Sequence, residues 1–478
     1  MSVLAAPGRE ISHTSTLPPL VAEAATAVPA FVGYTETATR FVPGDLIGRP
    51  IRIDNLAMFE VRFGKSPCRI DEVVVEDTGH FVSAWLTTPY LLHLSVRLFF
   101  ANGGGVCEVL SVGSRPESGP DCQQLLAGIH ALATRDELTL LLCPDAAQLP
   151  AREMACVQQA MLRQCSVLQD RFAVLDTRLD DPLAQAFCRH IGQNALREGA
   201  AYTPWLLLGH GTDPGYAALR SVLKRRGKSV RWFDLTRDMA VLAHLQALES
   251  ALACAALAEV ARLQTWLESH FDAYRSVVSG VLATPLACPP SGAVAGVYAA
   301  MDAQRGVWRA PANVAVLGAT APAVALNAEQ ASALNVDVSA GKSVNAIRTL
   351  ANRGLMIWGA RTLAGQDAEW RYVSVRRFVI HLQTSLKKAI DWVVFEPNDA
   401  ATWTRVRDLV GNYLLQKWHD GALLGATPEQ AFFVRCGLHQ TMTALDVRAG
   451  RLIVELGLAV LRPAEFITLR LEQQTQRA

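Results

Sequence analysis

A stretch at 358–377, WGARTLAGQDAEWRYVSVRR, combines positive charge with aromatic surface. It holds four arginines among two tryptophans and a tyrosine: Arg361, Arg371, Arg376, Arg377, Trp358, Trp370 and Tyr372. Guanidinium groups form charge-assisted hydrogen bonds with phosphates and carboxylates, and aromatic rings stack on bases or anchor protein interfaces. This composition fits a nucleic-acid surface, an anion pocket in an enzyme or a joint between protein subunits.

The charge balance argues against the nucleic-acid surface. The 478 residues include 45 Lys and Arg against 44 Asp and Glu, and Asp367 and Glu369 lie inside the stretch itself. Proteins that bind nucleic acids neutralise phosphates and normally carry a basic excess. Two alternatives stay open for each arginine, namely an anchor between subunits and an ordinary ion pair within its own domain.

Two glycine-containing motifs resemble anion-binding loops but lack required features. NGGGVCEVL at 102–110 is followed by a strand pattern, so we expect a simple turn there. VDVSAGKSV at 336–344 ends in Gly-Lys-Ser, but Val336 stands where a P-loop needs its first glycine. The enzyme alternatives are therefore an ATPase that uses Lys342 and a hydrolase built on the α/β region.

Other catalytic or metal-binding patterns are absent from the sequence. It contains no G-x-S-x-G or H-E-x-x-H motif, and His210 in GHGTDPG has no identifiable catalytic partner. The 10 cysteines include no C-x-x-C pair, so we expect reduced core residues in a cytosolic product. The sequence predicts a protein that is not an enzyme and has no cofactor and no bound metal.

The bulk composition favours self-association. Half of the residues are hydrophobic and the formal charge is only +1, which is poor for the solubility of a free monomer. We expect no signal peptide and no membrane span, because no basic segment precedes an apolar one at the start and no 18 uncharged apolar residues run together.

Hydrophobic periodicity divides the chain into five segments. We predict an extended arm at 1–30, a small strand-rich region at 31–120, an α/β domain at 121–357 with a helical insertion at 216–280, an α+β domain at 358–462 and a C-terminal arm at 463–478. The insertion has helical spacing at seven positions: Leu245, Leu248, Leu252, Leu257, Val260, Leu263 and Leu267.

The C-terminal part has the clearest pattern. One helix buries a face made of Phe378, Leu382, Leu386 and Ala389, and a second helix begins at Asn398 or Asp399 and ends at Gly421. The second helix presents a polar face made of four residues: Arg405, Asp408, Asn412 and Gln416. TALDV, the turn RAG and RLIVELGLAV indicate a β-hairpin. The last strand, FITLRLE, is expected to pair beyond its own compact body.

Many strings resemble contractile tail sheath proteins, above all the sheaths of phage-tail-like extracellular contractile injection systems. They include AVPAFVGYTE, DRFAVLD, PPSGAVAGVYAAMDAQRGVWRAPANV, LNVDVSAGKSVNAIR, WGARTLAGQDAEWRYVSVRR, VFEPNDAATW, GALLGATPEQAFFV and RPAEFITLRLEQ. They follow the family's order and cover nearly the whole chain outside the insertion.

The resemblance implies a fold and a set of partners. The fold is a subtilisin-like α/β middle domain without a protease site, an α+β C-terminal sheath domain, and N- and C-terminal β arms that pair with neighbouring subunits. The partners are further copies in six-fold rings, an inner tube protein, baseplate and tail terminator proteins and sheath paralogues. On this reading, the polar helix face of Arg405, Asp408, Asn412 and Gln416 is expected to contact the inner tube. The resemblance also implies assembly in the cytoplasm and release in a phage-tail-like particle. A baseplate-proximal sheath paralogue is the alternative within the same class.

The predicted subunit interface follows from the arms and the arginine stretch. It comprises Ile11, Phe466, Ile467, Leu469, Leu471, Arg361, Arg371, Arg376 and Arg377.

Overall fold

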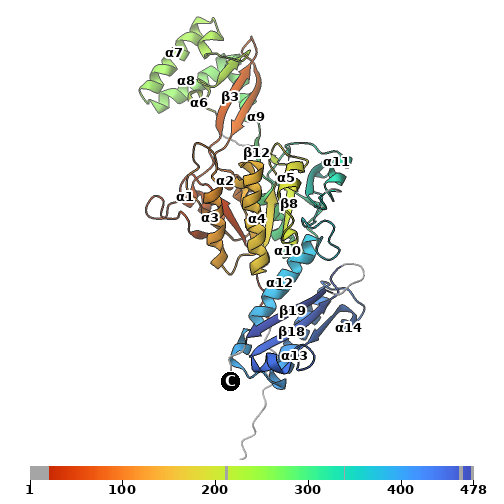
Figure 1. The fold of residues 1–478 in the computed structure, drawn as a ribbon. Coiled ribbons are helices and arrows are strands. Elements are labelled where there is room, and N and C mark those ends of the chain that lie inside the picture. The colour runs from red at the N-terminus through yellow and green to blue at the C-terminus, as the bar shows by residue number, and fades with distance from the viewer. Residues whose placement is uncertain (1–20, 210–213, 338–339, 462–466, 475–478) are drawn as a thin grey trace, which may run out of the picture. The chain divides into compact units, whose positions relative to one another are not determined.

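The computed structural model describes residues 21–209, 214–337, 340–461 and 467–474. They form two compact units: one is Ala25–Arg377, and the other is Phe378 onward together with residues 21–24. Ile11, His210 and Phe466 lie outside the described residues. Figure 1 labels the elements of both units.

The larger unit is built on a nine-stranded mixed sheet. In sheet order its strands are β13 (Val314–Ala315), β16 (Gly354–Ile357), β15 (Asn345–Leu350), β8 (Gly199–Thr203), β7 (Phe172–Asp176), β6 (Leu140–Leu142), β1 (Pro29–Gly33), β5 (Cys107–Ser111) and β2 (Pro50–Ile53). The strands from β15 to β5 run parallel, and antiparallel strands border them on both sides. Apolar runs such as FAVLD in β7 are buried throughout, as a parallel sheet covered on both faces requires.

Helices cover both faces of this sheet. On one face α2 (Leu91–Ala101) packs against α10 (Ser291–Arg305), and on the other α3 (Cys122–Ala131) packs against α4 (Ala151–Leu168). A Cβ at Gly292 would lie 2.1 Å from the carbonyl oxygen of Ser95, so only glycine lets α10 approach α2 this closely. The turn predicted at NGGG is confirmed, since Gly103 follows α2 with a φ of +89° and β5 comes next.

Helices occupy most of the segment predicted as a helical insertion, whereas the strands of 31–120 do not form a separate region. The strands of that region divide between two sheets: β1, β2 and β5 join the large sheet, whereas β3 (Arg69–Val75) and β4 (Phe81–Thr87) pair with β10 (Leu223–Arg225) and β11 (Lys228–Ser229). Short-range patterns cannot show this, because β3 pairs with a strand far away in sequence. The predicted arm also ends earlier than residue 30, since β1 begins at Pro29.

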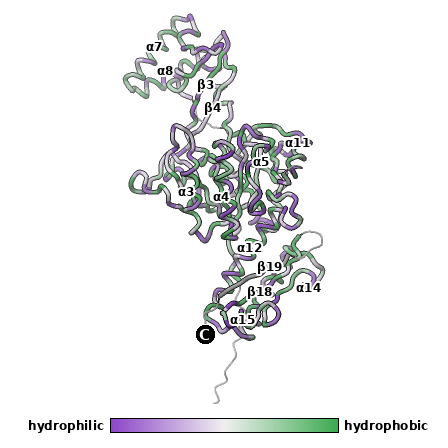
Figure 2. Tube along the Cα trace, in the orientation of Figure 1, coloured by the Kyte–Doolittle hydropathy of each residue, from purple (hydrophilic) through white to green (hydrophobic). Residues whose placement is uncertain are grey.

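The small sheet and its helices share a core of their own. The helices are α6 (Tyr216–Leu219), α7 (Met239–Ala253), α8 (Leu257–His270) and α9 (Asp272–Ala283). Five of the seven predicted leucine and valine positions are buried, Leu252 is partly buried and Leu257 is exposed. Trp232 lies at the centre, with Tyr274 and Phe271 against its ring. Hydrophobic and hydrophilic residues alternate along α7 and α8, as Figure 2 shows.

The smaller unit contains the two helices that the sequence predicts. The first is α12 (Val373–Ala389), which crosses from one unit to the other, so the boundary lies at 377/378 and not at 357/358. The second is α13 (Ala400–His419), whose N-cap is Asp399, with its carboxylate accepting a hydrogen bond from the Thr402 N–H. Gly421 follows the helix with a φ of 76°.

The predicted hairpin at TALDV and RLIVELGLAV is wrong. TALDV begins α15 (Ala444–Arg448), because Thr443 and Asp446 form a capping box that favours a helical turn. The strand β18 (Arg451–Leu458) pairs instead with β17 (Phe432–Arg435) on one side and with β19 (Ile467–Gln474) on the other. In the single chain the last strand therefore pairs with β18, and its predicted pairing with another subunit stays a prediction.

The remaining elements are short, and three of their strands form a small antiparallel sheet in the order β12-β9-β14. They are α1 (Leu56–Phe63), α5 (Gln185–His190), β9 (Leu206–Leu208), β12 (Leu286–Cys288), β14 (Ala321–Pro322), α11 (Ala328–Ala333), α14 (Pro428–Ala431), and the 3₁₀ helices Leu132–Thr134, Pro144–Gln148, Leu196–Glu198, Trp232–Asp234 and Asp391–Phe395.

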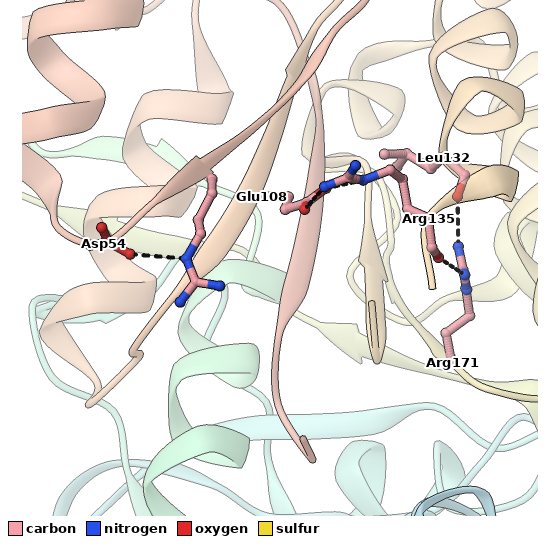
Figure 3. A network of polar contacts seen from close by, with 6 residues as sticks. Asp54, Glu108, Leu132, Arg135 and Arg171 are labelled. Atoms are coloured by element: carbon pink, nitrogen blue, oxygen red, sulfur yellow. Dashed lines mark hydrogen bonds and ion pairs between the residues drawn. The ribbon is translucent and has the colours of Figure 1, made fainter. Parts of the chain in front are cut away.

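A polar network braces the large sheet at the start of β7 (Figure 3). Arg171 is 1% exposed and donates to the carbonyl oxygens of Leu132 and Arg135. Arg135 in turn forms a two-point ion pair with Glu108 on β5. A buried guanidinium is tolerated because its donors are used, so these bonds fix the turn after α3 between two strands.

Two buried carboxyl groups follow or end neighbouring strands. Burial raises the pKa of both Asp145 and Asp176 to about 7. Asp176, the last residue of β7, accepts hydrogen bonds from the N–H and Oγ of Ser291, at 2.8 and 2.6 Å. This pair joins the end of the strand to the first turn of α10.

The Asp176→Asn variant tests the effect of this carboxyl group on stability. Between about pH 4 and pH 7 the folded chain keeps the Asp176 proton, whereas the unfolded chain has lost it. The contribution of Asp176 to the free energy of unfolding is therefore present at pH 4. It is lost as the pH rises to 7, by up to about 1.4 kcal/mol per pH unit. In urea denaturation from pH 4 to 8, we expect the wild type to lose free energy of unfolding relative to the variant. Parallel pH profiles would contradict the prediction.

Candidate assembly surfaces

Arg376, on the first turn of α12, is neutralised inside the larger unit. Its side chain is 4% exposed, and its Nε donates to Glu198 Oε2 at 2.9 Å. Glu198 is fully buried and also accepts from Arg197 Nε at 3.0 Å. The guanidinium group of Arg376 lies 5.2 Å from the centre of the Trp370 ring. Arg376, Glu198 and Trp370 thus pack together inside the larger unit, and we call this group the internal anchor.

Arg377 is held in the same way by a different carboxylate. Its guanidinium group forms a two-point ion pair with Asp302 on α10, at 3.0 and 2.5 Å, and both side chains are 4% exposed. It also donates to the carbonyl oxygen of Thr26 and lies 4.5 Å from the centre of the Tyr298 ring. The Arg377 side chain, which belongs to α12, therefore also binds the chain segment at Thr26 within the larger unit.

Arg361 and Arg371 are only half-buried. Both approach the Tyr372 ring, at 5.9 and 6.0 Å, and Arg371 Nε donates to the Asp367 carbonyl oxygen at 3.2 Å. For Arg376 and Arg377, the described contacts are within the chain. Of the four, only Arg361 and Arg371 keep partly exposed side chains, and an interface role for the arginines stays a prediction.

The side chains that a nucleotide-binding or a serine-dependent enzyme would use are buried in the larger unit. Lys342 is 2% exposed and its ammonium group donates to the Cys188 carbonyl oxygen at 2.6 Å, so it is not presented to a nucleotide. Ser291 is fully buried and donates to Asp176, and no histidine hydrogen-bonds to either group among the described residues. This arrangement lacks the base that a serine nucleophile requires.

Within the described ranges, the side chains form no group of three metal-ligating residues. In the same part of the chain, none of the helices has the length and apolar character that crossing a membrane requires.

The terminal sheet of the smaller unit ends in the last strand of the chain. All eight residues of β19 face a residue of β18 in antiparallel register, from Ile467 opposite Leu458 to Gln474 opposite Arg451. The predicted interface residues Ile467, Leu469 and Leu471 thus lie in this ladder. Within the described residues, β19 pairs only on its β18 side, so its other edge is open to a further strand.

The N-terminal segment is fixed to the same unit by Glu23. Its carboxylate forms ion pairs with Lys417 on α13 and with His381 on α12, the latter at 3.5 Å. Lys417 is 4% exposed and also pairs with Asp420 at 3.2 Å. The Ala24 N–H donates to Ser385 Oγ at 3.0 Å. The chain preceding residue 21 therefore starts from a defined place on the smaller unit.

The residues of this attachment were missed by the sequence reasoning, although a signal exists. Lys417 occupies a helix position that continues the buried stripe of Val410, Tyr413 and Leu414, where an apolar residue is expected. A buried lysine requires a counter-charge. Glu23 interrupts an apolar stretch in the same way, but the sequence does not show that the two meet.

The polar face predicted on α13 is confirmed as exposed. Its four residues, Arg405, Asp408, Asn412 and Gln416, are all in the exposed class. Arg405 pairs with Glu396 at 3.3 Å and lies 4.2 Å from the centre of the Trp392 ring. This face combines both charges with amides and is suited to a polar protein surface.

Comparison with known proteins identifies relatives of the whole chain. Residues 365–474 match the model of the phage tail sheath C-terminal domain. The anti-feeding prophage (AFP) baseplate contains a chain with 27% identity and a TM-score of 0.60, over 99% of this chain and 100% of that one. The contracted PVC sheath complex, from an extracellular contractile injection system, contains one with 27% identity and a TM-score of 0.58, over 100% and 99%.

A more distant relative shares the fold alone. The sheath tail protein of Desulfitobacterium hafniense has 9% identity and a TM-score of 0.52, over 99% of this chain and 100% of that one. No curated protein sequence matches the chain significantly. The resemblance to contractile tail sheath proteins and the mixed α/β fold are confirmed.

The Arg376→Ala variant tests the internal anchor. It removes one of the two cationic partners of the fully buried Glu198 in the described structure, and breaking a buried ion pair by removing one partner costs about 3–5 kcal/mol. We expect a loss of roughly 3 kcal/mol in the free energy of unfolding, measured by chemical denaturation. Arg361→Ala is the control, since a half-buried cation contributes about 1 kcal/mol or less.

A second substitution separates charge from packing. The double variant Arg376→Ala with Glu198→Gln should recover part of the loss, because the glutamine carries no charge to be compensated. Equal stability of Arg376→Ala and Arg361→Ala would contradict the anchor.

Proposed function

We propose that this chain is a structural, non-enzymatic subunit of a contractile sheath, stacked as six-fold rings around an inner tube. Its similarity over the full chain to a protein of a contracted injection-system sheath supports the sheath and its contraction. Contraction of the polymer would drive the inner tube through a target envelope. The particle would be assembled in the cytoplasm and then released.

The observation that carries the proposal is the ladder between β18 and β19. The same strand from another copy has the same sequence, so it would make the same backbone bonds with β18 that the chain's own strand makes. Exchange of identical elements between subunits costs little for this reason.

The attachment at Glu23 supports a matching role for the N-terminal arm. Lys417 and His381 hold the start of this arm on the unit that contains the terminal sheet. An arm that begins there and carries Ile11 would add a strand to a neighbour, for example at the open edge of the ladder. Both connections to neighbours would then begin and end on the smaller unit.

This arrangement explains how a sheath contracts without dissociating. Head-to-tail contacts that do not close produce helical arrays. In the extended sheath, subunits would be kinetically trapped, and contraction would move them outward into a better-packed lattice. The terminal arms keep the subunits joined to one another while the contacts between their larger units are exchanged. Arg361 and Arg371 would take part in the exchanged contacts.

The exposed face of α13 is our proposed contact with the inner tube. Arg405, Asp408, Asn412 and Gln416 lie along one side of the helix at spacings of three and four residues. A mixed polar face binds and releases a surface more readily than an apolar one, and release is necessary when the sheath contracts. Further partners of the polymer would be the baseplate, the tail terminator and sheath paralogues.

A specialised subunit next to the baseplate is the second candidate. It is favoured by the similarity to a chain in the AFP baseplate structure. Such a paralogue would form only the first ring, whereas a principal sheath protein polymerises without limit.

A reversible cross-link tests strand exchange. Glu455 and Arg470 face each other in the ladder, so the double variant Glu455→Cys with Arg470→Cys can join β19 to its own chain before assembly. We expect the oxidised variant to remain as separate subunits and the reduced variant to form striated tubes. Negative-stain electron microscopy and sedimentation measure both states.

The single variants Glu455→Cys and Arg470→Cys are the matched controls and should assemble in either redox state. Removal of residues 464–478 should also leave soluble subunits. The truncation exposes one edge of β18, whereas the cross-link leaves that edge paired with β19. Intact tubes from the oxidised double variant, or from the truncated chain, would contradict the proposed exchange of β19 between subunits.

Site-specific photo-cross-linking tests the tube contact. A benzophenone side chain at Asn412 should give a cross-link to the tube protein in extended particles, because this position lies mid-way along the exposed face. The same group at Leu445, which is 73% exposed on the same unit, is the control and should give none. Equal yields at the two positions would contradict the assignment.

A further inference from the structure

Two cysteines from different helices line one open recess of the larger unit. Cys122 is the first residue of α3, and Cys156 lies one and a half turns into α4. The recess has a volume of about 660 Å³ and includes Pro116, Asp121 and Arg152. Cys156 is exposed and Cys122 is partly exposed, whereas six of the ten cysteines are buried. Solvent therefore reaches both thiols.

Cys122 lies against the first turn of α4, next to the turn that carries Cys156. Cys122 Sγ lies 3.8 Å from the carbonyl oxygen of Glu153, which precedes Cys156 by less than one helical turn. Burial raises the pKa of Cys122 to about 11, with further contributions from the adjacent Cys156 thiol and from the Glu153 and Asp121 carboxylates. α3 and α4 pack directly on each other, so the pair is held together by the fold.

We propose that Cys122 and Cys156 form a redox-active dithiol, which closes to an intrachain disulfide between α3 and α4 by exchange with a low-molecular-weight disulfide. The pair is a property of the folded chain, so this proposal does not depend on the sheath function. A disulfide here closes a loop from one helix to the next and restricts the unfolded chain.

The chemistry takes two exchange steps. The Cys156 thiolate, the more accessible of the two, attacks one sulfur of the external disulfide and displaces one thiol, giving a mixed disulfide. The Cys122 thiolate then attacks Cys156 Sγ and displaces the second thiol. Two protein thiols are oxidised to one disulfide, the external disulfide is reduced to two thiols, and the two cysteine protons end on the released thiols.

Oxidised glutathione is the probe for the experiment. The folded full-length chain is treated with it, the free thiols are alkylated in denaturant, and tryptic peptides are analysed without reduction. We expect the count of free thiols to fall by two from ten, and peptide 153–163 to be linked to peptide 98–135. Peptide 98–135 also contains Cys107, so fragmentation must place the link at Cys122.

Three single variants serve as controls. Cys122→Ser and Cys156→Ser should abolish the linked peptide, and Cys254→Ser, which removes an exposed cysteine from α7's C-terminal end, should not. Oxidation should raise the melting temperature of the wild type by a few degrees and leave that of Cys156→Ser unchanged. The proposal is overturned if Cys156 is recovered only as its glutathione adduct with Cys122 still alkylated, or if the linked species is a dimer.

Discussion

Backbone hydrogen bonding at the end of the chain is the constraint on which the proposed assembly depends. β18 lies between two strands, and its N–H and C=O groups need partners on both edges. The partner on one edge, β19, is the terminal strand, joined through a connection that includes Pro463. Because the bonds are made by the backbone, β18 does not distinguish its own terminal strand from a copy. The same eight-residue ladder thus describes a closed subunit and, after exchange, a link in a polymer.

The arginine-rich stretch serves a different purpose from the one its composition suggests. Arg376 and Arg377 are buried against Glu198 and Asp302, and the aromatic rings beside them complete the packing. Buried ion pairs contribute little net stability, but a chain that lacks one partner is strongly destabilised. Such pairs specify how Arg376 and Arg377, in the first turns of α12, pack within the larger unit.

Local patterns predicted the long helices, the Asp399 cap and the helical insertion, because periodicity and capping act within a few residues. They failed at TALDV, where the Thr443–Asp446 capping box makes a short helix in a region of strand-like composition. Contacts between residues far apart in sequence could not be predicted from local patterns. Examples are the pairing of β3 with β10 and the ion pair of Glu23 with Lys417. The resemblance to sheath proteins supplied the arms, but it did not show that the isolated chain pairs its last strand internally.

Among the residues that the structure describes, the hydrophobic core of the inserted subdomain of β3, β4 and α6–α9 is made by residues within 70–86 and 216–281. Its packing is therefore complete without the large sheet. A module of this kind can diverge in sequence, or be replaced by another of similar footprint, while the lattice-forming parts of the chain stay under separate selection. In the proposed sheath, the insertion is consequently the part of the subunit to which we would graft an epitope or an affinity tag, because its core is separate from that of the large sheet.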